Sequence, residues 1–242
     1  MTIMHRQYHE WWSPSLGRKM ELLEFGHGGA TIVAFPTSGG RFFEWEDRGM
    51  VEALRPMIER GWYRLVCLDS VDRESWYARW KHPGGRVWRQ VEYDNYVYHE
   101  VLPFVDARAG DNYVIAAGAS FGAYHALSFG MRHPERVQRI LAMSGLVDIK
   151  MFADGYSSDE LYRLNPTDFI PNENDPERLA RHRGQELIFA VGNGDRLVHQ
   201  NRELSGKLWG KGIGNALREW DGFAHDWPVW HRMINLYIGG QA

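Results

Sequence analysis

The stretch that decides the fold is YVIAAGASFGAYHALSFG, residues 113–130. An apolar, β-branched run ends at the pentapeptide Gly-Ala-Ser-Phe-Gly, and an alanine-rich segment follows it. A strand that turns sharply into a helix crowds its own backbone at the serine. Small residues two positions before and two positions after that serine relieve the crowding. Gly118 and Gly122 stand at those two positions, so the pattern predicts that Ser120 protrudes from a strand–helix turn as a nucleophile.

Short apolar runs alternate with longer amphipathic runs on both sides of this junction. Strands are predicted over 19–25, 31–36, 63–69, 113–118, 137–145, 185–195 and 215–220, and helices over 50–61, 91–108, 120–133, 197–212 and 227–238. This alternation indicates the α/β class, with a mostly parallel central sheet and helices on both faces. The polar segment 146–183 is expected to be an excursion that holds a short helix, or a partial cap, within a single domain spanning 1–242.

Composition argues against several other classes of function. The chain has 28 Lys and Arg against 31 Asp and Glu and no basic block, so we expect neither a nucleic-acid partner nor a membrane partner. No run approaches the roughly 18 apolar residues of a membrane span, and the N-terminal stretch lacks a secretory pattern, which predicts a cytoplasmic protein. Cys67 lies in an apolar strand and is expected to be buried. The sequence has no His-Glu-x-x-His or Cys-x-x-Cys pattern, so no metal or cofactor is expected.

A nucleophilic serine needs a base that accepts its proton and an acid that orients the base. In parallel sheets, ligands bind beyond the carboxyl ends of the strands. His225 lies in a loop just after the strand 215–220, and Asp195 ends the strand before it. We therefore expect Ser120, Asp195 and His225 to form a catalytic triad, in the chain order of α/β-hydrolases.

Other histidines and aspartates are weaker candidates for the base and the acid. His199 begins a helix near Asp195 and is the rival base, whereas His125 and His231 lie on helices and are expected to be structural. Asp148, which follows the preceding strand, is the alternative acid. Asp226 adjoins His225, and sequence neighbours rarely face each other correctly.

The oxyanion of a tetrahedral intermediate needs preorganised N–H donors. One donor should be the backbone N–H of Phe121, immediately after the nucleophile. The second should come from the loop after the strand 31–36, from Ser38 or Gly39, and the sequence leaves that choice open. We expect 41–47, 70–90 and 146–172 to shape the substrate entrance, with Arg41, Trp76 and Trp80 as candidate binding residues. The alternative is that 69–88 is only a long packed loop.

Residues 116–148, AAGASFGAYHALSFGMRHPERVQRILAMSGLVD, resemble the nucleophile region of esterases related to esterase D (S-formylglutathione hydrolase) and to the antigen 85 mycolyltransferases. The shared features are the Ser120 turn, His133-Pro134-Glu135 and Ser144-Gly145. YHEVLPFVDAR (98–108) is similar to the helix before the nucleophile strand, and DGFAHDWPVW (221–230) to the histidine segment. The chain departs from the family pattern at Pro36-Thr37, where many members carry His-Gly, and at Ala123, where a second glycine is common.

The resemblance implies an α/β-hydrolase fold and a serine esterase that cleaves small carboxylic esters through an acyl-enzyme. A homo-oligomer is compatible with it. Two alternatives remain open at this point. An acyltransferase would use the same triad with an alcohol in place of water, and a non-catalytic binding module would keep the fold without the reaction.

Overall fold

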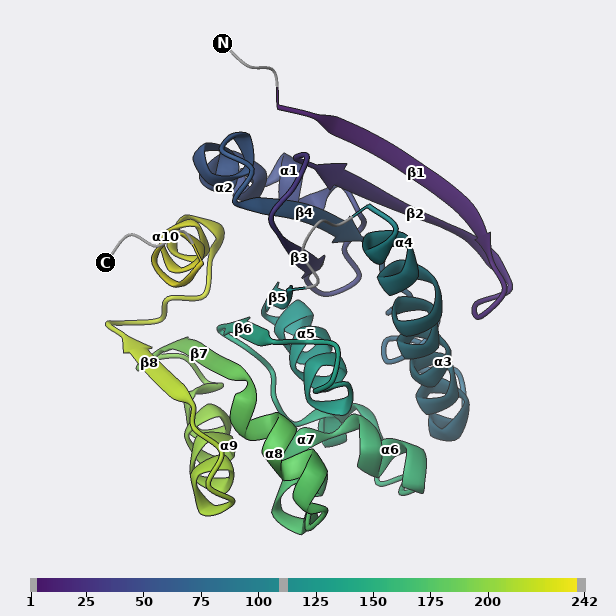
Figure 1. The fold of residues 1–242 in the computed structure, drawn as a ribbon. Helices are drawn as coiled ribbons and strands as arrows, with labels where there is room; N and C mark the ends of the chain where they lie inside the picture. The colour runs from purple at the N-terminus through teal and green to yellow at the C-terminus, as the bar shows by residue number, and fades with distance from the viewer. Residues whose placement is uncertain (1–3, 109–112, 239–242) are drawn as a thin grey trace.

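The centre of the molecule is one twisted sheet of eight strands (Figure 1). The computed structural model describes residues 4–108 and 113–238, so the two ends of the predicted 1–242 domain lie outside the described residues. The strands are β1 (Arg6–Ser13), β2 (Arg18–Phe25), β3 (Ala30–Phe35), β4 (Tyr63–Leu68), β5 (Val114–Ala119), β6 (Arg139–Met143), β7 (Glu186–Gly192) and β8 (Ala216–Trp220). They lie in the order β1-β2-β4-β3-β5-β6-β7-β8. The pairs β1–β2 and β2–β4 are antiparallel and the others are parallel, which confirms the predicted mostly parallel sheet.

Helices cover both faces of the sheet, as the alternating pattern predicted. One face packs against α1 (Glu44–Asp47), α2 (Met50–Glu59) and α10 (Trp227–Tyr237), and the other against α3 (Pro83–Tyr96), α4 (Leu102–Asp106), α5 (Phe121–Arg132) and α9 (Val198–Gly210). Successive side chains of a strand point to opposite faces. On β3, Ile32 and Ala34 join the first core, whereas Val33 and Phe35 join the second. Figure 1 shows α2 and α10 on one side of the sheet and α3, α4 and α5 on the other.

The long helix predicted over 91–108 begins earlier and is interrupted. α3 starts at Pro83, and the side chain of His82 caps it by accepting the N–H of Gly84. A π-helical turn, η1 (Val97–Val101), separates α3 from α4. Pro103 has no N–H to donate and crowds the preceding turn, which accounts for a local change of helical pitch at this point. The helix therefore takes in part of the predicted loop 70–90.

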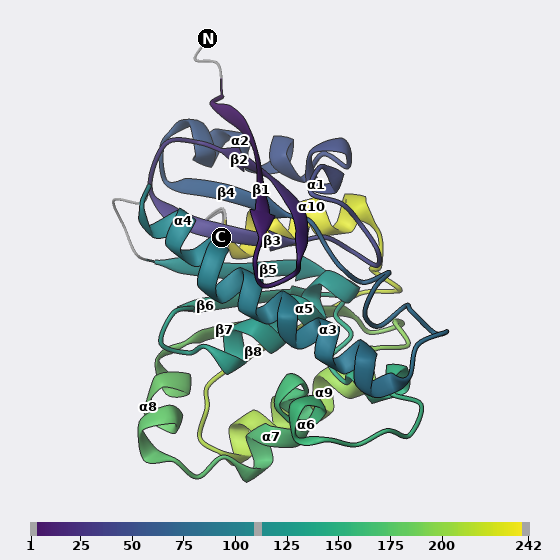
Figure 2. The same cartoon turned by 90° about the vertical axis from the view of Figure 1, so that its right-hand side faces the viewer.

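Two further elements differ from the sequence-based expectation. β1 was not predicted, because this edge strand exposes charged and aromatic side chains on both faces and lacks a clear apolar stripe. The excursion 146–183 contains three α-helices where one was expected: α6 (Asp159–Leu164), α7 (Pro166–Phe169) and α8 (Pro176–Gly184), with short 3₁₀ turns η2 (Ile149–Phe152) and η3 (Ile170–Asn172). In Figure 2, α6 and α7 lie beside α9, and α8 lies apart from them on the other side of the view.

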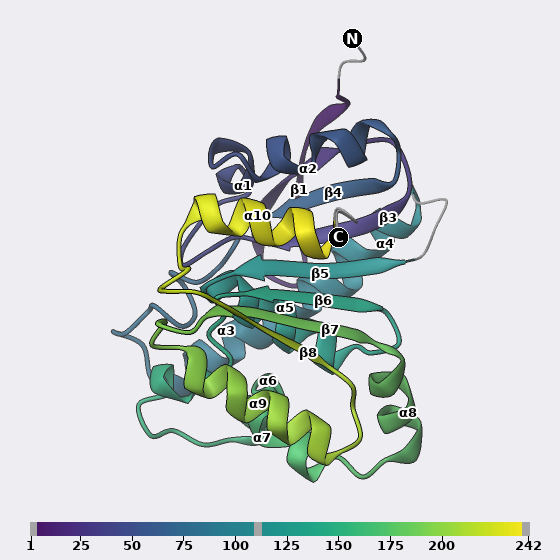
Figure 3. The ribbon, with the colours of Figure 1, turned by 90° about the vertical axis from the view of Figure 1, so that its left-hand side faces the viewer.

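The parallel strands β3 to β8 all end at one edge of the sheet, which Figure 3 shows on the side where the chain passes from β8 into α10. Ser120 follows β5 at this edge, Asp195 follows β7, and His225 follows β8. Among the described residues, no helix is both long enough and apolar enough to cross a membrane.

Candidate active site

Ser120 occupies a strained backbone conformation between β5 and α5. Its φ of 55° and ψ of −116° lie in a region that residues other than glycine rarely adopt. A Cβ atom at Gly118 would overlap the carbonyl of Gly122, and one at Gly122 would overlap the carbonyls of Phe35 and Pro36. The two glycines thus allow β5, α5 and the loop after β3 to approach one another closely at this serine.

Ser120, His225 and Asp195 form one hydrogen-bonded chain. The hydroxyl Oγ of Ser120 is 3.0 Å from Nε2 of His225, and Nδ1 of His225 is 2.7 Å from Oδ2 of Asp195. The Asp195 carboxylate is buried, and its other oxygen accepts the N–H of Leu197. Because a carboxylate only accepts hydrogen bonds, Nδ1 carries a proton and Nε2 is free to accept the proton of the serine hydroxyl.

The loops that carry the histidine and the aspartate are fastened to each other. The N–H of Asn193 donates to the carbonyl of Trp220, and the N–H of Gly194 donates to the carbonyl of Gly222. A Cβ atom at Gly192 would overlap the carbonyls of Gly222 and Phe223, so this position needs a glycine. These contacts fix the distance between His225 and Asp195.

Ser144, at the end of β6, holds the histidine loop from the other side. Its hydroxyl donates to the carbonyl of Ala224 at 2.6 Å and accepts from the indole N–H of Trp230 at 2.9 Å. The Trp230 ring also contacts the imidazole of His225, with centroids 5.4 Å apart. Ala224 has a positive φ of 43°, a costly conformation that these bonds stabilise. In the sequence, Ser144 stands out only as part of a strand-end motif.

The three expected oxyanion donors differ in what their N–H groups contact. Phe121 is the first residue of α5, so its N–H has no acceptor within the helix. The N–H of Gly39 already donates to Oδ2 of Asp72 at 2.8 Å. The N–H of Ser38 has no hydrogen-bond partner in the described part of the chain, and its hydroxyl accepts from Tyr77 at 2.9 Å. The amide of Gly39 is therefore engaged, whereas those of Ser38 and Phe121 have no acceptor within 4–108 and 113–238.

A buried polar network that was not predicted lies behind the Gly39 loop. Oδ1 of Asp72 is 2.7 Å from Nε2 of His125, and Nδ1 of His125 is 3.3 Å from the amide nitrogen of Gln90. Asp72 and His125 are almost fully buried. His125 was predicted to be a packing residue, and it does contact the rings of Phe35 and Phe121. No local pattern marks the pair, because its members are 53 positions apart in the sequence.

Aromatic side chains contact the residues next to the serine and its histidine. The ring of Tyr77 lies 5.2 Å from that of Phe121 and 5.3 Å from that of Phe152, and Phe223 stacks on His225. Burial raises the pKa of Tyr77, so its hydroxyl stays protonated as a donor to Ser38. Tyr77 and Phe152 come from 70–90 and 146–172, which were expected to shape the substrate entrance.

The three predicted substrate-binding residues have different surroundings. Trp76 is fully buried and packs edge-on against Tyr124, so it belongs to the core and is not exposed to a substrate. Trp80 is 77% exposed. Arg41 pairs with Glu21 and donates to Oδ1 of Asp69 at 2.7 Å. Burial raises the pKa of Asp69, and the Arg41 guanidinium opposes that rise. Arg41 also lines a cavity of about 240 Å³ beside Gly39.

Three of the rival residues, His231, Asp226 and Asp148, are engaged elsewhere. His231 contacts the carbonyl of Arg48 at 2.6 Å, and Asp226 caps α10. Asp148 accepts from the side chain of Asn165 and caps η2.

Cys67 is buried in β4, and this burial raises the pKa of its thiol. Within 4–108 and 113–238, no three His, Cys, Asp or Glu side chains are grouped as metal ligands would be.

The model of the putative esterase family matches residues 63–235, which include all three members of the hydrogen-bonded chain. The chain belongs to this family. It is therefore a carboxylic ester hydrolase on the α/β-hydrolase fold, as the resemblance implied. A search of curated proteins gives no significant match to this esterase.

Solved structures similar to the esterase share its fold over nearly their whole length. A protein described as a ferulic acid esterase has a TM-score of 0.79 at 20% identity, covering 97% of this chain and 96% of its own. An S-formylglutathione hydrolase from Agrobacterium tumefaciens has a TM-score of 0.77 at 15% identity, covering 98% and 94%. A fluorophosphonate-binding serine hydrolase from Staphylococcus aureus has a TM-score of 0.70 at 16% identity, covering 98% and 97%.

Proposed function

We propose that this esterase is a serine hydrolase whose nucleophile is Ser120, whose base is His225 and whose orienting acid is Asp195. The observation that carries this proposal is the continuous hydrogen-bonded chain from Ser120 Oγ through both nitrogens of His225 to the buried Asp195 carboxylate. A triad is recognised by this geometry and by the role of each group. The strained turn at Ser120 supports the same assignment.

The proposed reaction has two steps, acylation of Ser120 and hydrolysis of the acyl-enzyme. Ser120 Oγ attacks the ester carbonyl carbon while Nε2 of His225 takes the hydroxyl proton. The tetrahedral intermediate collapses, and the alcohol leaves with that proton, so that an acyl group remains on Ser120. Water then attacks the acyl-enzyme, gives its proton to His225, and releases the acid as the proton returns to Ser120. Asp195 stabilises the imidazolium in both steps.

The N–H groups of Phe121 and Ser38 are proposed to bind the oxyanion. Phe121 has an unpaired amide at a helix N-terminus, where the helix dipole favours negative charge. Ser38 is supported by two contacts: its hydroxyl accepts from Tyr77, and the next amide, that of Gly39, is held by Asp72. We assign to Asp72 and His125 the role of positioning residues that fix this loop from behind.

The aromatic surroundings of Ser120 favour an ester that carries a flat ring. Tyr77, Phe121 and Phe152 form one cluster, and Phe223 lies over His225 with 59% of its surface exposed. Aromatic rings pack well against such side chains. One similar structure is described as a ferulic acid esterase, which is compatible with a ring-bearing acyl group. Arg41 and Trp80 remain candidates for contact with the polar part of the substrate.

Hydrolysis of two methyl esters tests this function. We expect methyl cinnamate to be cleaved with a higher kcat/KM than methyl hexanoate, and Ser120→Ala to abolish both activities. The chain neighbours of Ser120 are Ala119 and Phe121, so no adjacent hydroxyl can take over the attack in that variant. A preference for methyl hexanoate would overturn the ring-bearing substrate but not the triad. Activity retained by Ser120→Ala would overturn the triad.

A further inference from the structure

A second cavity lies away from the carboxyl edge of the sheet, where the excursion 146–183 packs on the end of α5. Its volume is about 460 Å³, which is in the range of small-molecule sites. We call it the arginine pocket, and the lining residues that matter here are Arg132, His133, Tyr162, Arg163, Phe169 and Arg178. Ser120 immediately precedes α5 and Arg132 ends it, so at 1.5 Å per residue the two lie about 18 Å apart along the helix axis. The arginine pocket is thus separate from the candidate active site.

The charges that line the arginine pocket are unbalanced. Three arginines line it against one carboxylate, Glu173, which is paired with Arg178 at 2.9 Å. Arg163 is exposed and has no hydrogen bond and no ion pair within 4 Å among the described residues, although its charge acts on the nearby carboxylate of Glu160. This excess of positive charge occurs in a chain whose net charge is −3.

Arg132 also has unused donors. Its Nη1 is buried without a hydrogen bond and lies 3.5 Å from Oδ2 of Asp94. That same oxygen is 2.9 Å from Nε2 of His133, so it is shared between two side chains. The guanidinium of Arg132 is therefore held only by this long ion pair, and an anion in the pocket would supply its other nitrogens with closer acceptors.

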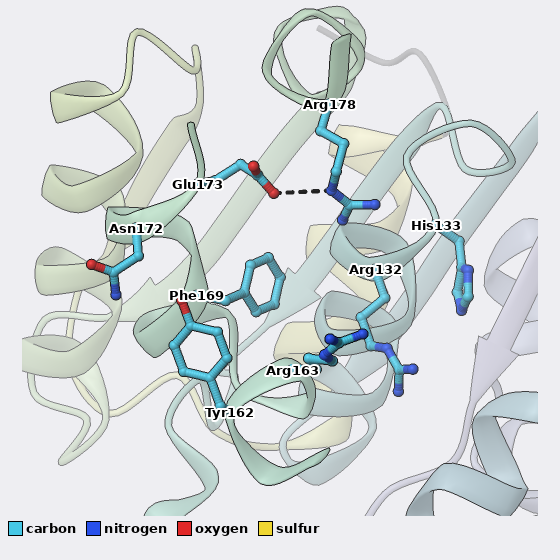
Figure 4. Close-up of a pocket in the computed structure, with 8 residues that line it drawn as sticks. All are labelled: Arg132, His133, Tyr162, Arg163, Phe169, Asn172, Glu173 and Arg178. Atoms are coloured by element: carbon cyan, nitrogen blue, oxygen red, sulfur yellow. Dashed lines mark hydrogen bonds and ion pairs between the residues drawn. The ribbon is translucent and has the colours of Figure 1, made fainter. Parts of the chain in front are cut away.

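The arginine pocket has an apolar side as well. In Figure 4 the guanidinium groups of Arg132, Arg163 and Arg178 lie along one side, and the rings of Phe169 and Tyr162 lie along the other. Phe169 is nearly buried, and Tyr162 is 39% exposed. A ligand that satisfies both sides carries a multiply charged anionic group and a flat or apolar body.

We propose that the arginine pocket binds a small phosphate monoester, with its phosphate on Arg132 and Arg163 and its organic part against Tyr162 and Phe169. Guanidinium groups bind phosphate oxygens through paired, charge-assisted hydrogen bonds. The exposed guanidinium of Arg163 and the loosely held guanidinium of Arg132 suit the three oxygens of a phosphate dianion better than the two of a carboxylate. The volume of the pocket suits a small molecule. This proposal does not depend on the triad.

Calorimetric titration at low ionic strength tests the ligand class, because salt screens such contacts. The probes are phenyl phosphate, inorganic phosphate, benzoate and phenol. We expect saturable one-to-one binding of phenyl phosphate, weaker binding of inorganic phosphate and of benzoate, and none of phenol. Absence of phenyl phosphate binding would overturn the proposal. Equal affinity for benzoate would overturn the assignment to phosphate.

Variants locate the binding. Arg163→Gln and Arg132→Gln should each weaken phenyl phosphate binding by about tenfold or more. Arg181→Gln is the matched control, because Arg181 lies on α8 but does not line the pocket, and it should bind as the wild type does. Tyr162→Ala should weaken phenyl phosphate but leave inorganic phosphate unchanged. Because Arg163 is exposed and unpaired among the described residues, Arg163→Gln should fold normally, and unchanged binding in that variant would place the anion elsewhere.

Discussion

The backbone N–H of Gly39 donates a 2.8 Å hydrogen bond to Oδ2 of Asp72, a carboxylate that is completely buried. The other oxygen of that carboxylate is 2.7 Å from Nε2 of His125 on α5, the helix that begins at the candidate nucleophile. The loop after β3 is thus connected through two side chains to the helix that carries Phe121. This connection fixes the relative position of the two proposed oxyanion donors.

Removal of the Asp72 side chain should therefore impair turnover more than substrate binding. In Asp72→Ala, the Gly39 amide loses its acceptor, and the Ser38 amide loses its fixed orientation. We expect kcat to fall by up to the ~10²–10³ that loss of one oxyanion donor costs, with KM nearly unchanged. Asp72→Asn keeps an acceptor oxygen for Gly39 and should recover much of the activity. A rise in KM with constant kcat would contradict the positioning role.

The acid can be tested by a pair of isosteric substitutions. Asp195→Asn keeps the shape of the site but no longer stabilises the protonated Nδ1 of His225, so kcat should drop by about 10⁴. Asp148→Asn alters the rival acid, which contacts Asn165 and Lys150, and should leave kcat within about twofold of the wild type. Steady-state ester hydrolysis compares the two. If Asp148→Asn caused the larger loss, the acid would be misassigned.

Substitution by alanine should change the free energy of unfolding in opposite directions at a crowded glycine of the nucleophile turn and at an uncrowded glycine of α3. In Gly118→Ala the new Cβ overlaps the carbonyl of Gly122, so the free energy of unfolding should fall by about 1–3 kcal/mol or more. Gly85 lies in α3 with open space around it, and Gly85→Ala should raise the free energy of unfolding by about 0.5–1 kcal/mol. Urea unfolding measures both. Equal stability of the two variants would contradict the close approach of the Gly122 carbonyl to Gly118.

The buried imidazole of His182 predicts a pH dependence of stability. Burial lowers the pKa of His182 below its ordinary value of 6.5, and its Nε2 has no hydrogen-bond partner among the described residues. The unfolded chain takes up a proton near pH 6.5 whereas the folded chain does not, so the free energy of unfolding falls as the pH falls below that value. Between about pH 7.5 and 5.5, His182→Gln should lose less stability than the wild type. His99→Gln, at an exposed position, should follow the wild type.

Much of the architecture could be predicted because local patterns encode it. The apolar run that ends at Gly-x-Ser-x-Gly indicates both a strand and the turn into α5, and each triad candidate lies at the end of a strand or in the loop after it. Since parallel strands end at a common edge, three distant positions could be placed together without further information. The π-helical interruption of the helix near Pro103 was not predicted, because it is a local change of helical pitch. The edge strand β1 was not predicted either, because it lacks an apolar face.

Other features depend on contacts that no local pattern reveals. The bond between Asp72 and His125 joins residues that become neighbours only in the folded chain. The other oxygen of Asp72 accepts the N–H of Gly39, and this contact distinguishes the Gly39 amide from that of Ser38. Trp76 and Trp80 are four residues apart in one segment, yet one is fully buried and the other is 77% exposed. Composition alone gives no means to tell these two tryptophans apart.

The central claim is that Ser120 is an activated nucleophile, and labelling with a fluorophosphonate tests it most directly. The wild-type protein and Ser120→Ala are treated with the reagent, and their intact masses are measured. We expect a single adduct on the wild type and none on the variant. A folded wild-type protein that takes up no adduct, or a variant that is still labelled, would contradict the claim and favour a non-catalytic binding module or a different nucleophile.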